Sequence, residues 1–407
     1  MRRPLSPARL PLAILCAVLV SPAQSADSIR IGVIAPLSSP ASVDMGKSIV
    51  GGARVFVQDI NATGGVLGRK VELVIRDDQA NPDTGASAAR ELVEKEKVAA
   101  VVGIANTGVV MQAAKVMQGA RIPLIISAST GAVIGRSFMP PAIADSYVFR
   151  TSASDELQAV ALLDEAVKRR QFNRIALLHD DSPYGVSGRE SFQKAFSKYA
   201  LEPVLVGSFK VGGNDHEALL GKLKSSGAQA VILYGLATDA GEIVKRMDKQ
   251  GIRMAVIGPW PLTQQSFLNT AGKSADGVRA VATFVENELS SSKGQFALSY
   301  RRLNDTATIP SAVAAAQTYD ALRLLSLAMT QAASTDGPKV RDALENLKYP
   351  TTSTVTARYA RPFTPQDHEA ISQEMVVMTE IRHGKLEYAY KEDAANATLL
   401  RTKTGGR

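Results

Sequence analysis

The 407-residue sequence contains one cysteine, one tryptophan and four histidines. The cysteine, Cys16, lies in an N-terminal leader, so we expect no disulfide, no catalytic thiolate and no cysteine-ligated metal in the rest of the chain. The histidines stand too far apart to show the spacing of metal ligands, and each is expected in a solvated or loop position. They are His179, His216, His368 and His383.

Signals for other kinds of site are also few. Basic residues are scattered and form no stripe interleaved with aromatic residues, so nucleic acid is not an expected partner. No GxGxxG follows a predicted strand, no GxSxG occurs, and the P-loop-like Gly46-Lys47-Ser48 has Ala41 where the motif requires glycine. The acidic pairs at 77–78 and 180–181 are expected to cap helices or satisfy loops. We therefore expect neither catalysis nor a cofactor or metal.

Residues 1–26 have the features of an export signal. Three arginines precede an apolar core at 10–20, which is too short for an ordinary transmembrane helix, and small residues follow. We expect cleavage between Ala23 and Ala26, which places the rest of the chain in the periplasm. Removal of this leader takes the formal charge of the chain from +8 to +5, because the leader contains three arginines and no acidic residue. No later apolar run approaches the roughly 18 residues of a membrane span.

The segment directly behind the leader predicts a ligand-binding unit. Residues 29–35 form a β-rich run, 36–44 form a loop with hydroxyl side chains, and apolar residues then recur at helical spacing. A strand thus delivers a polar loop to the N-terminus of a helix. In parallel α/β sheets, unpaired backbone N–H groups at such a position hold small anionic or polar groups.

Strand and helix patterns alternate along most of the chain. Near-continuous apolar strands separated by helices indicate parallel sheets covered on both faces. Two such series predict two doubly wound lobes. The first has strands at 29–35, 71–77, 99–104 and 123–127, with helices at 82–96 and 109–119. The second has strands at 147–151, 174–179, 204–209, 230–234 and 254–258, with helices at 155–169, 186–199, 215–225 and 239–250.

After Gly277 the pattern begins again. It predicts a strand at 278–284, a long helix at 311–332, and a Thr- and Pro-rich connector at 350–366. Residues 373–380 and 386–390 predict a hairpin with His383-Gly384 at its turn. The polar tail at 393–407 is expected to be mobile.

Several segments together resemble a known family. They are IRIGVIAPLSSP, GGARVFVQDINATGGVLGRKVELVIRDD, VAAVVGIANTG, IPLIISAST, RIALLHDDSPYG and VIGPW. In this order and spacing, from Ile29 to about Tyr390, the chain resembles the periplasmic leucine/isoleucine/valine-binding type of solute-binding protein, the receptor of an ATP-driven importer. The resemblance implies two Rossmann-like lobes joined by three hinge crossovers. It assigns residues 27–150 and 280–365 to the N-terminal lobe, and 151–279 and 366–392 to the C-terminal lobe.

Two loops of the first lobe are expected to hold the ligand's head group. Asn106-Thr107-Gly108 follows one predicted strand, and Ser127-Ala128-Ser129-Thr130 follows the next, so both offer hydroxyls and N–H groups at the carboxyl edge of the sheet. The resemblance implies that Thr107, Ala128 and Thr130 bind an α-carboxylate. Helix capping alone is the alternative for these side chains.

The second lobe is expected to supply the opposing wall. Tyr184 matches a tyrosine that relatives press against the ligand, and Leu236 matches a pocket-wall position; an exposed loop position is the alternative for Tyr184. At Trp260, amino-acid binders of this family place a carboxylate for the ligand ammonium. Either another acid, such as Asp181 or Asp239, takes that role, or the ligand has no ammonium and Trp260 forms an aromatic wall. Packing in the core is the alternative for Trp260.

These observations predict a monomeric periplasmic receptor that closes over a small carboxylate-bearing solute. The expected partners are the solute and a membrane permease with its ATPase. A branched-chain or other aliphatic amino acid is favoured by the resemblance, whereas an aromatic acid is favoured by Trp260. A sensor or regulatory module of the same fold, which needs no permease, is the alternative role.

Overall fold

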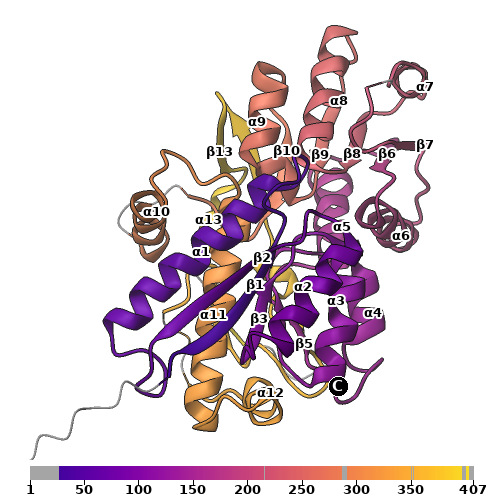
Figure 1. The fold of residues 1–407 in the computed structure, drawn as a ribbon. Coiled ribbons are helices and arrows are strands. Elements are labelled where there is room, and N and C mark those ends of the chain that lie inside the picture. The colour runs from indigo at the N-terminus through magenta and orange to yellow at the C-terminus, as the bar shows by residue number, and fades with distance from the viewer. Residues whose placement is uncertain are drawn as a thin grey trace, which may run out of the picture.

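The computed structural model describes residues 27–214, 216–286, 291–349, 351, 353–396 and 400–402. The predicted leader, with Cys16 and the expected cleavage region, lies outside them. The described chain forms two α/β lobes, one above the other, each built on a mainly parallel sheet (Figure 1). This is the architecture of two doubly wound lobes that the sequence predicts.

The first lobe, at the bottom of Figure 1, has five parallel strands in the order β2-β1-β3-β4-β5. Side chains of β1 (Ile29–Ala35) alternate between two cores: Ile31 and Val33 pack with helices α1 and α11, while Ile34 packs with α2 and α3. Helices therefore cover both faces of the sheet. The other strands are β2 (Val71–Asp77), β3 (Ala100–Gly103), β4 (Leu124–Ile126) and β5 (Val148–Arg150). The helices are α1 (Val43–Ala62), α2 (Pro82–Glu94), α3 (Thr107–Ala120), α4 (Ala132–Phe138), α10 (Ser292–Leu303), α11 (Ala312–Ala332) and α12 (Gly337–Glu345).

The second lobe has seven strands in the order β13-β12-β10-β9-β8-β6-β7, and all pair in parallel except the terminal hairpin. Helices again cover both faces, because Leu177 packs with α5 and α6 while Leu178 packs with α7, α8 and α9. The strands are β6 (Ile175–Asp180), β7 (Leu205–Phe209), β8 (Ala230–Tyr234), β9 (Ala255–Gly258), β10 (Arg279–Ala282), β12 (Val377–Arg382) and β13 (Lys385–Tyr388). The helices are α5 (Asp155–Leu163), α6 (Pro183–Lys198), α7 (Glu217–Ser225), α8 (Ala237–Lys249) and α9 (Gln265–Ala271).

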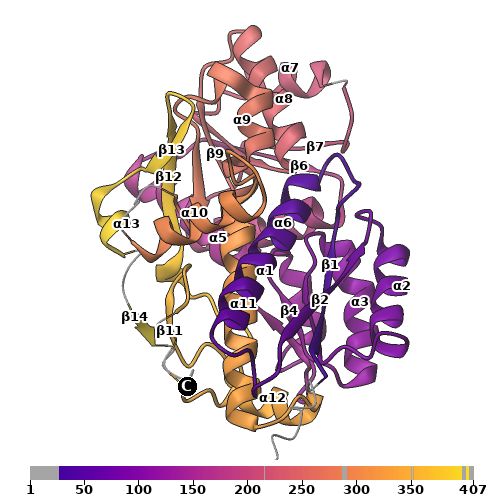
Figure 2. The same ribbon diagram turned by 60° about the vertical axis from the view of Figure 1, so that its left-hand side comes forward.

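The chain passes between the lobes after β5, after β10 and again before β12. The first and third passages run side by side: the Arg150 N–H donates to the His368 carbonyl over 2.9 Å, and the Ala370 N–H donates to the Arg150 carbonyl over 2.8 Å. Figure 2 shows the long helix α11 beside α1 in the first lobe, while the β12–β13 hairpin lies in the second. Each lobe therefore contains segments from distant parts of the sequence.

Two strands differ from the sequence-based assignment. The strand predicted at 147–151 was grouped with the second series, but β5 pairs with β4 in the first sheet. The boundary predicted at 279/280 falls inside β10, which pairs with β9 and β12 in the second sheet. The boundary predicted at 365/366 precedes residues 368–370, which still pair beside Arg150. Apolar patterns locate strands, but they do not identify their neighbours.

The C-terminal region is more structured than expected. The predicted hairpin is present, and His383 and Gly384 form its two-residue turn with φ values of +51° and +72°. The predicted connector contains β11 (Arg358–Ala360), which pairs with β14 (Leu400–Thr402). The tail predicted to be mobile also includes part of helix α13 (Lys391–Asn396). Residues 397–399 and 403–407 lie outside the described chain.

Candidate ligand-binding cleft

A cavity of about 380 Å³ lies between the two lobes. Six loops line it, three from each lobe, and each loop follows the carboxyl end of a parallel strand, where α/β sheets bind ligands. The N-terminus of α3 faces that of α6, because a Cβ placed on Gly108 would lie only 3.4 Å from Pro183. The lining residues are Ser39, Ala41, Ser42, Gln79, Ala80, Pro82, Asn106, Thr107, Gly108, Asp181, Ser182, Pro183, Tyr184, Val211 and Leu236.

The first-lobe wall contains the predicted polar loops. Asn106 and Thr107 line the cavity at the start of α3, and the Asn106 amide donates to the Ser42 hydroxyl over 3.0 Å. Asn106 makes no side-chain bond to the first turn of α3, so helix capping does not account for it. The Thr107 and Ser129 hydroxyls are 3.2 Å apart, which joins the two predicted loops. Ala128, Ser129 and Thr130 are buried behind this wall.

The second-lobe wall combines Tyr184 and apolar residues with the polar Asp181 and Ser182. Tyr184 and Leu236 both line the cavity, as predicted from the sequence, and each is less than a tenth exposed. The Tyr184 ring packs on Tyr234 with ring centroids 4.7 Å apart. Asp180 connects the loop after β6 to the loop after β8. Its carboxylate accepts hydrogen bonds from the Ser182 and Leu236 N–H groups, each over 3.0 Å. This confirms the expectation that Asp180 satisfies loop backbone.

Trp260 lies apart from the cleft cavity. It belongs to the 3-10 helix η2 (Trp260–Thr263), is 5% exposed, and lines a separate narrow cavity of about 10 Å³ near the segments that cross between the lobes. Its backbone N–H donates to the Gln158 side chain over 3.2 Å. This placement favours packing in the core beside the crossover segments over the predicted aromatic wall of the ligand site.

Asp181 and Asp239 were considered as acids that could pair with a ligand ammonium in place of a carboxylate at position 260. In the structure, both bind the loop after β7. Asp181 accepts a hydrogen bond from the Val211 N–H over 3.0 Å, and Asp239 accepts one from the Gly212 N–H over 2.9 Å. Asp181 is exposed at the rim of the cleft, whereas Asp239 is buried, which raises its pKa. Both carboxylates thus anchor the loop after β7.

Sequence reasoning missed Asp155, the first residue of α5. Its side chain is fully buried, and one oxygen, Oδ1, accepts a hydrogen bond from the Tyr234 hydroxyl. Burial raises its pKa, while the hydroxyls of Tyr234, Thr130 and Ser187 act in the opposite direction. In the sequence, Ser154-Asp155 at a helix start reads as an ordinary N-terminal acid, so no signal distinguished it.

Three of the four histidines are buried, contrary to the sequence-based expectation. His368 has no exposed surface; its Nδ1 lies 2.8 Å from the Val148 carbonyl oxygen, and its ring stacks on Phe149 with centroids 4.0 Å apart. His179 and His216 are also buried, whereas His383 is exposed at the hairpin turn.

Among the described residues, no group of three or more His, Cys, Asp or Glu side chains is placed to hold a metal ion.

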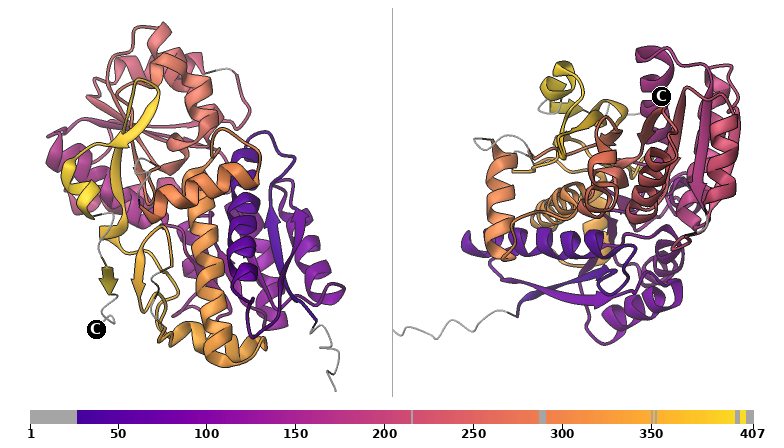
Figure 3. Two further views of the ribbon diagram at one scale, coloured as in Figure 1. Left: turned by 90° about the vertical axis from the view of Figure 1, so that its left-hand side faces the viewer. Right: turned by 90° about the horizontal axis from the view of Figure 1, so that it is seen from above.

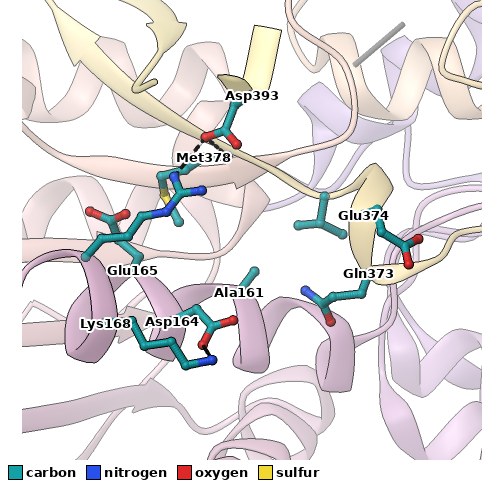
Figure 4. Close-up of a pocket in the computed structure, with 10 residues that line it drawn as sticks. Ala161, Asp164, Glu165, Lys168, Gln373, Glu374, Met378 and Asp393 are labelled. Carbon is teal, nitrogen blue, oxygen red and sulfur yellow. Dashed lines mark hydrogen bonds and ion pairs between the residues drawn. The ribbon is translucent and has the colours of Figure 1, made fainter. Parts of the chain in front are cut away.

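A second cavity, of about 350 Å³, lies away from the cleft between α5 and the C-terminal segment (Figure 4). It borders the π-helix η1 (Asp164–Arg169), and its charged residues pair with one another or with close neighbours. Arg169 binds Asp393 at 3.1 Å, and Glu165 pairs with Arg279. These contacts anchor α13 to the second lobe, so we assign no ligand to this cavity.

The family follows from the comparison with known sequences. A family model described as periplasmic binding protein matches residues 28–385. The chain belongs to this family. Members of the periplasmic binding protein family are solute-binding proteins, and the fold matches type I periplasmic binding proteins. The recognised resemblance to the Leu/Ile/Val-binding type is confirmed. No helix in the described part of the chain is long and apolar enough to cross a membrane.

Individual relatives agree with this assignment. The "Leu/Ile/Val-binding protein homolog 3" of Brucella melitensis biotype 1 is 29% identical over 308 residues, which cover 76% of this chain and 80% of that protein. The substrate-binding protein LivJ of Streptococcus pneumoniae, in complex with isoleucine, matches with a TM-score of 0.77 at 25% identity, covering 89% and 98% of the two chains. An ABC-transporter solute-binding protein of Rhodopseudomonas palustris BisB5, in complex with 3,4-dihydroxybenzoic acid, shares the fold with a TM-score of 0.72 at 21% identity, covering 89% and 95%.

Proposed function

We propose that this protein captures a small carboxylate-bearing solute in the periplasm and delivers it to an ABC permease and its ATPase. The cleft geometry carries the proposal: hydroxyl and backbone groups of one lobe face Tyr184 and Leu236 on the other. The N-termini of α3 and α6 point toward the same cavity, and their positive dipole ends favour an anion. The protein acts as a monomeric receptor and not as an enzyme.

Closure of the lobes is the proposed mechanism. Ligand contacts from Thr107 and Tyr184 come from different lobes and exist together only when the cleft is closed, so a ligand shifts the population toward that state. Two further contacts join the lobes beside the cleft. The Asp44 carboxylate accepts from the Ser266 N–H over 2.8 Å, and Arg136 binds Glu190 at 3.0 Å.

Titration calorimetry with a panel of amino acids, oxo acids and aromatic acids tests the proposal. We expect at least one class to bind with a dissociation constant in the micromolar range or below, and to decrease the radius of gyration in X-ray scattering. Trp260 provides an independent signal, because it is the single tryptophan and packs among the hinge segments. Absence of binding by every member of the panel would refute capture of a small carboxylate.

A further inference from the structure

The strand β7 forms one end of the second sheet. It pairs in parallel with β6 on one side, and no strand of the described chain pairs with its other side. In Figure 1 it lies at the right-hand border of the second lobe, with α7 above it and α6 below. The outer backbone N–H and C=O groups of an end strand can pair with another extended segment. β7 therefore presents a pairing edge to the outside of the molecule.

Exposure alternates along this strand. Leu205 and Phe209 pack against a core of the second lobe. Val204, Val206 and Ser208 are exposed and point to the opposite face, because successive side chains of a strand alternate. Val204 is 37% exposed and Val206 is 43% exposed. Two neighbouring apolar side chains are thus left in solvent on one face of an edge strand, where cover by a further segment would bury them.

The other three ends of the two sheets are protected by charge or by cover. On β2 the single exposed residue is Glu72, and on β13 the exposed residues are Lys385 and Glu387. The outer side of β5 pairs with the crossover segment at 368–370. Charged side chains and covering segments are the usual means by which proteins prevent edge strands from pairing. Between residues 204 and 208, β7 has neither kind of protection.

Opposite charges stand symmetrically on the two sides of this apolar run. Glu202 precedes it and Lys210 follows it, each four residues from Val206, and both are exposed. Neither side chain forms an ion pair within the described chain. If two copies of β7 pair antiparallel about Val206, Glu202 of each copy lies opposite Lys210 of the other. An antiparallel pair centred on any other residue loses both of these charge pairs, so the charges of the strand complement a second copy in one register.

We propose that β7 is a self-association surface, on which a second copy of this chain pairs antiparallel through residues 202–210. The pairing continues the second sheet across two molecules and brings the two Val206 side chains together at its centre. Because the same surface serves on both copies, the contact has two-fold symmetry and closes as a dimer. Each copy retains its own cleft, so the proposed capture of a solute by a single chain does not depend on this pairing.

The size of the contact sets its expected strength. Two short strands bury less than the roughly 1,200 Å² of a stable interface, so we expect reversible association with a dissociation constant of about 0.1 to 1 mM. The monomer then predominates at the micromolar concentrations used for ligand titration. Sedimentation equilibrium of the exported protein, from about 10 µM to about 1 mM at low salt, measures the association. The weight-average mass should rise about 1.5-fold or more over this range.

Charge reversal tests the register. Glu202→Lys and Lys210→Glu each place like charges opposite one another, and each should weaken association about fivefold or more. The double variant restores opposite charges with their signs exchanged, so its dissociation constant should return to within about twofold of the wild-type value. Lys249→Glu makes the same charge change at an exposed lysine of α8, and this control should leave association unchanged.

Val206→Lys tests the centre of the contact. Position 206 is exposed, so this variant should fold normally, but two lysines at the symmetry axis should abolish association. A wild-type mass that stays at the monomer value up to the highest concentration would overturn the proposal and leave this edge to a different polypeptide. Association that survives Val206→Lys, or that the double charge variant does not restore, would place the contact elsewhere and overturn the proposal as well.

Discussion

Thr107 connects the first turn of α3 to the neighbouring loop through its hydroxyl, which lies 3.2 Å from that of Ser129. Thr107→Val retains the shape of the side chain but removes this hydroxyl from the cleft wall. We expect affinity for carboxylate ligands to fall about tenfold, which corresponds to a hydrogen bond worth about 1.4 kcal/mol. Calorimetry measures the change, and Thr63→Val, at the exposed end of α1, is the control. Unchanged affinity in Thr107→Val would remove this residue from the binding site.

Asp78 makes stability depend on pH near neutrality. Burial raises its pKa from 3.8 to about 7, and its Oδ2 makes no hydrogen bond within the described chain, while Oδ1 accepts from the Ala80 N–H over 2.7 Å. An acid with a raised pKa in the folded state favours folding while protonated. Its contribution to the unfolding free energy is therefore present below about pH 4 and is lost as the pH rises through 7.

Asp78→Asn tests this effect, because asparagine can retain the bond to Ala80 without the buried charge. The unfolding free energy of the wild-type protein should fall by about 2 to 3 kcal/mol more than that of the variant between pH 5 and pH 8. Urea denaturation at several pH values provides the measurement. Asp83→Asn, which changes an exposed acid in the first turn of α2, should follow the wild type. Parallel pH curves for Asp78→Asn and wild type would contradict the prediction.

The sequence located some residues of the candidate cleft, and their binding of a ligand stays a prediction. Asn106, Thr107, Tyr184 and Leu236 were found because strand ends and helix starts mark the carboxyl edge of a sheet, and all four line the cleft. Asp155 was not found, because a buried carboxylate with an unbonded oxygen and a solvated helix-start acid have the same sequence pattern. The position of Trp260 depends on three crossover segments distant in sequence, which no local pattern reveals.

At the scale of elements, α6 must approach β8 closely for the aromatic wall to form. A Cβ placed on Gly188 would lie 2.0 Å from the Tyr234 ring, so Gly188→Ala should displace this ring and disturb its contacts with Tyr184 and Asp155. We expect a loss of about 1 to 3 kcal/mol in unfolding free energy and a loss of ligand affinity of about tenfold. Urea denaturation and calorimetry measure the two effects.

Gly221→Ala is the matched control, because Gly221 lies in α7 and a Cβ there meets no atom within 4 Å. This variant should gain about 0.5 to 1 kcal/mol in stability and bind ligand normally. If Gly188→Ala behaved in the same way as Gly221→Ala, close packing of α6 on Tyr234 would not be required for binding.

The longer elements could be predicted from the sequence, and the reasons are physical. β1 and β2 match their predicted residues, and α11 differs by one residue, because a buried strand or a long buried helix needs an extended apolar pattern. The short helices α4 and α9, each of 7 residues, were not predicted, since two turns carry too little periodicity. Sheet membership of β5 and β10 depends on long-range pairing, which the pattern does not contain.

At the scale of the whole molecule, an exposed ion pair across the cleft should favour the closed state. Arg136 of α4 binds Glu156 at 3.3 Å and Glu190 at 3.0 Å, both in the second lobe. Exposed pairs contribute about 0.2 to 1 kcal/mol, so Arg136→Ala should weaken ligand binding by about two- to fivefold. The difference in ligand affinity between Arg136→Ala and the wild type should disappear at about 1 M salt, where exposed charges are screened.

Arg253→Ala removes an exposed ion pair within the second lobe, to Asp248, and should leave affinity unchanged. Calorimetry at low and high salt compares the two variants. If the loss of ligand affinity in Arg136→Ala did not depend on salt, or if Arg253→Ala lost as much affinity, the ion pairs of Arg136 would not act by favouring closure.

The interleaving of the two lobes has a consequence for how the protein is made. The second sheet receives β12 and β13 only from residues 377–388, and the core of the first lobe requires α11 from residues 312–332 (Figure 3). A nascent chain emerging from its N-terminus therefore completes neither core until most of the polypeptide has been synthesised. Both halves should acquire protease resistance at nearly the same moment, late in synthesis, rather than one after the other.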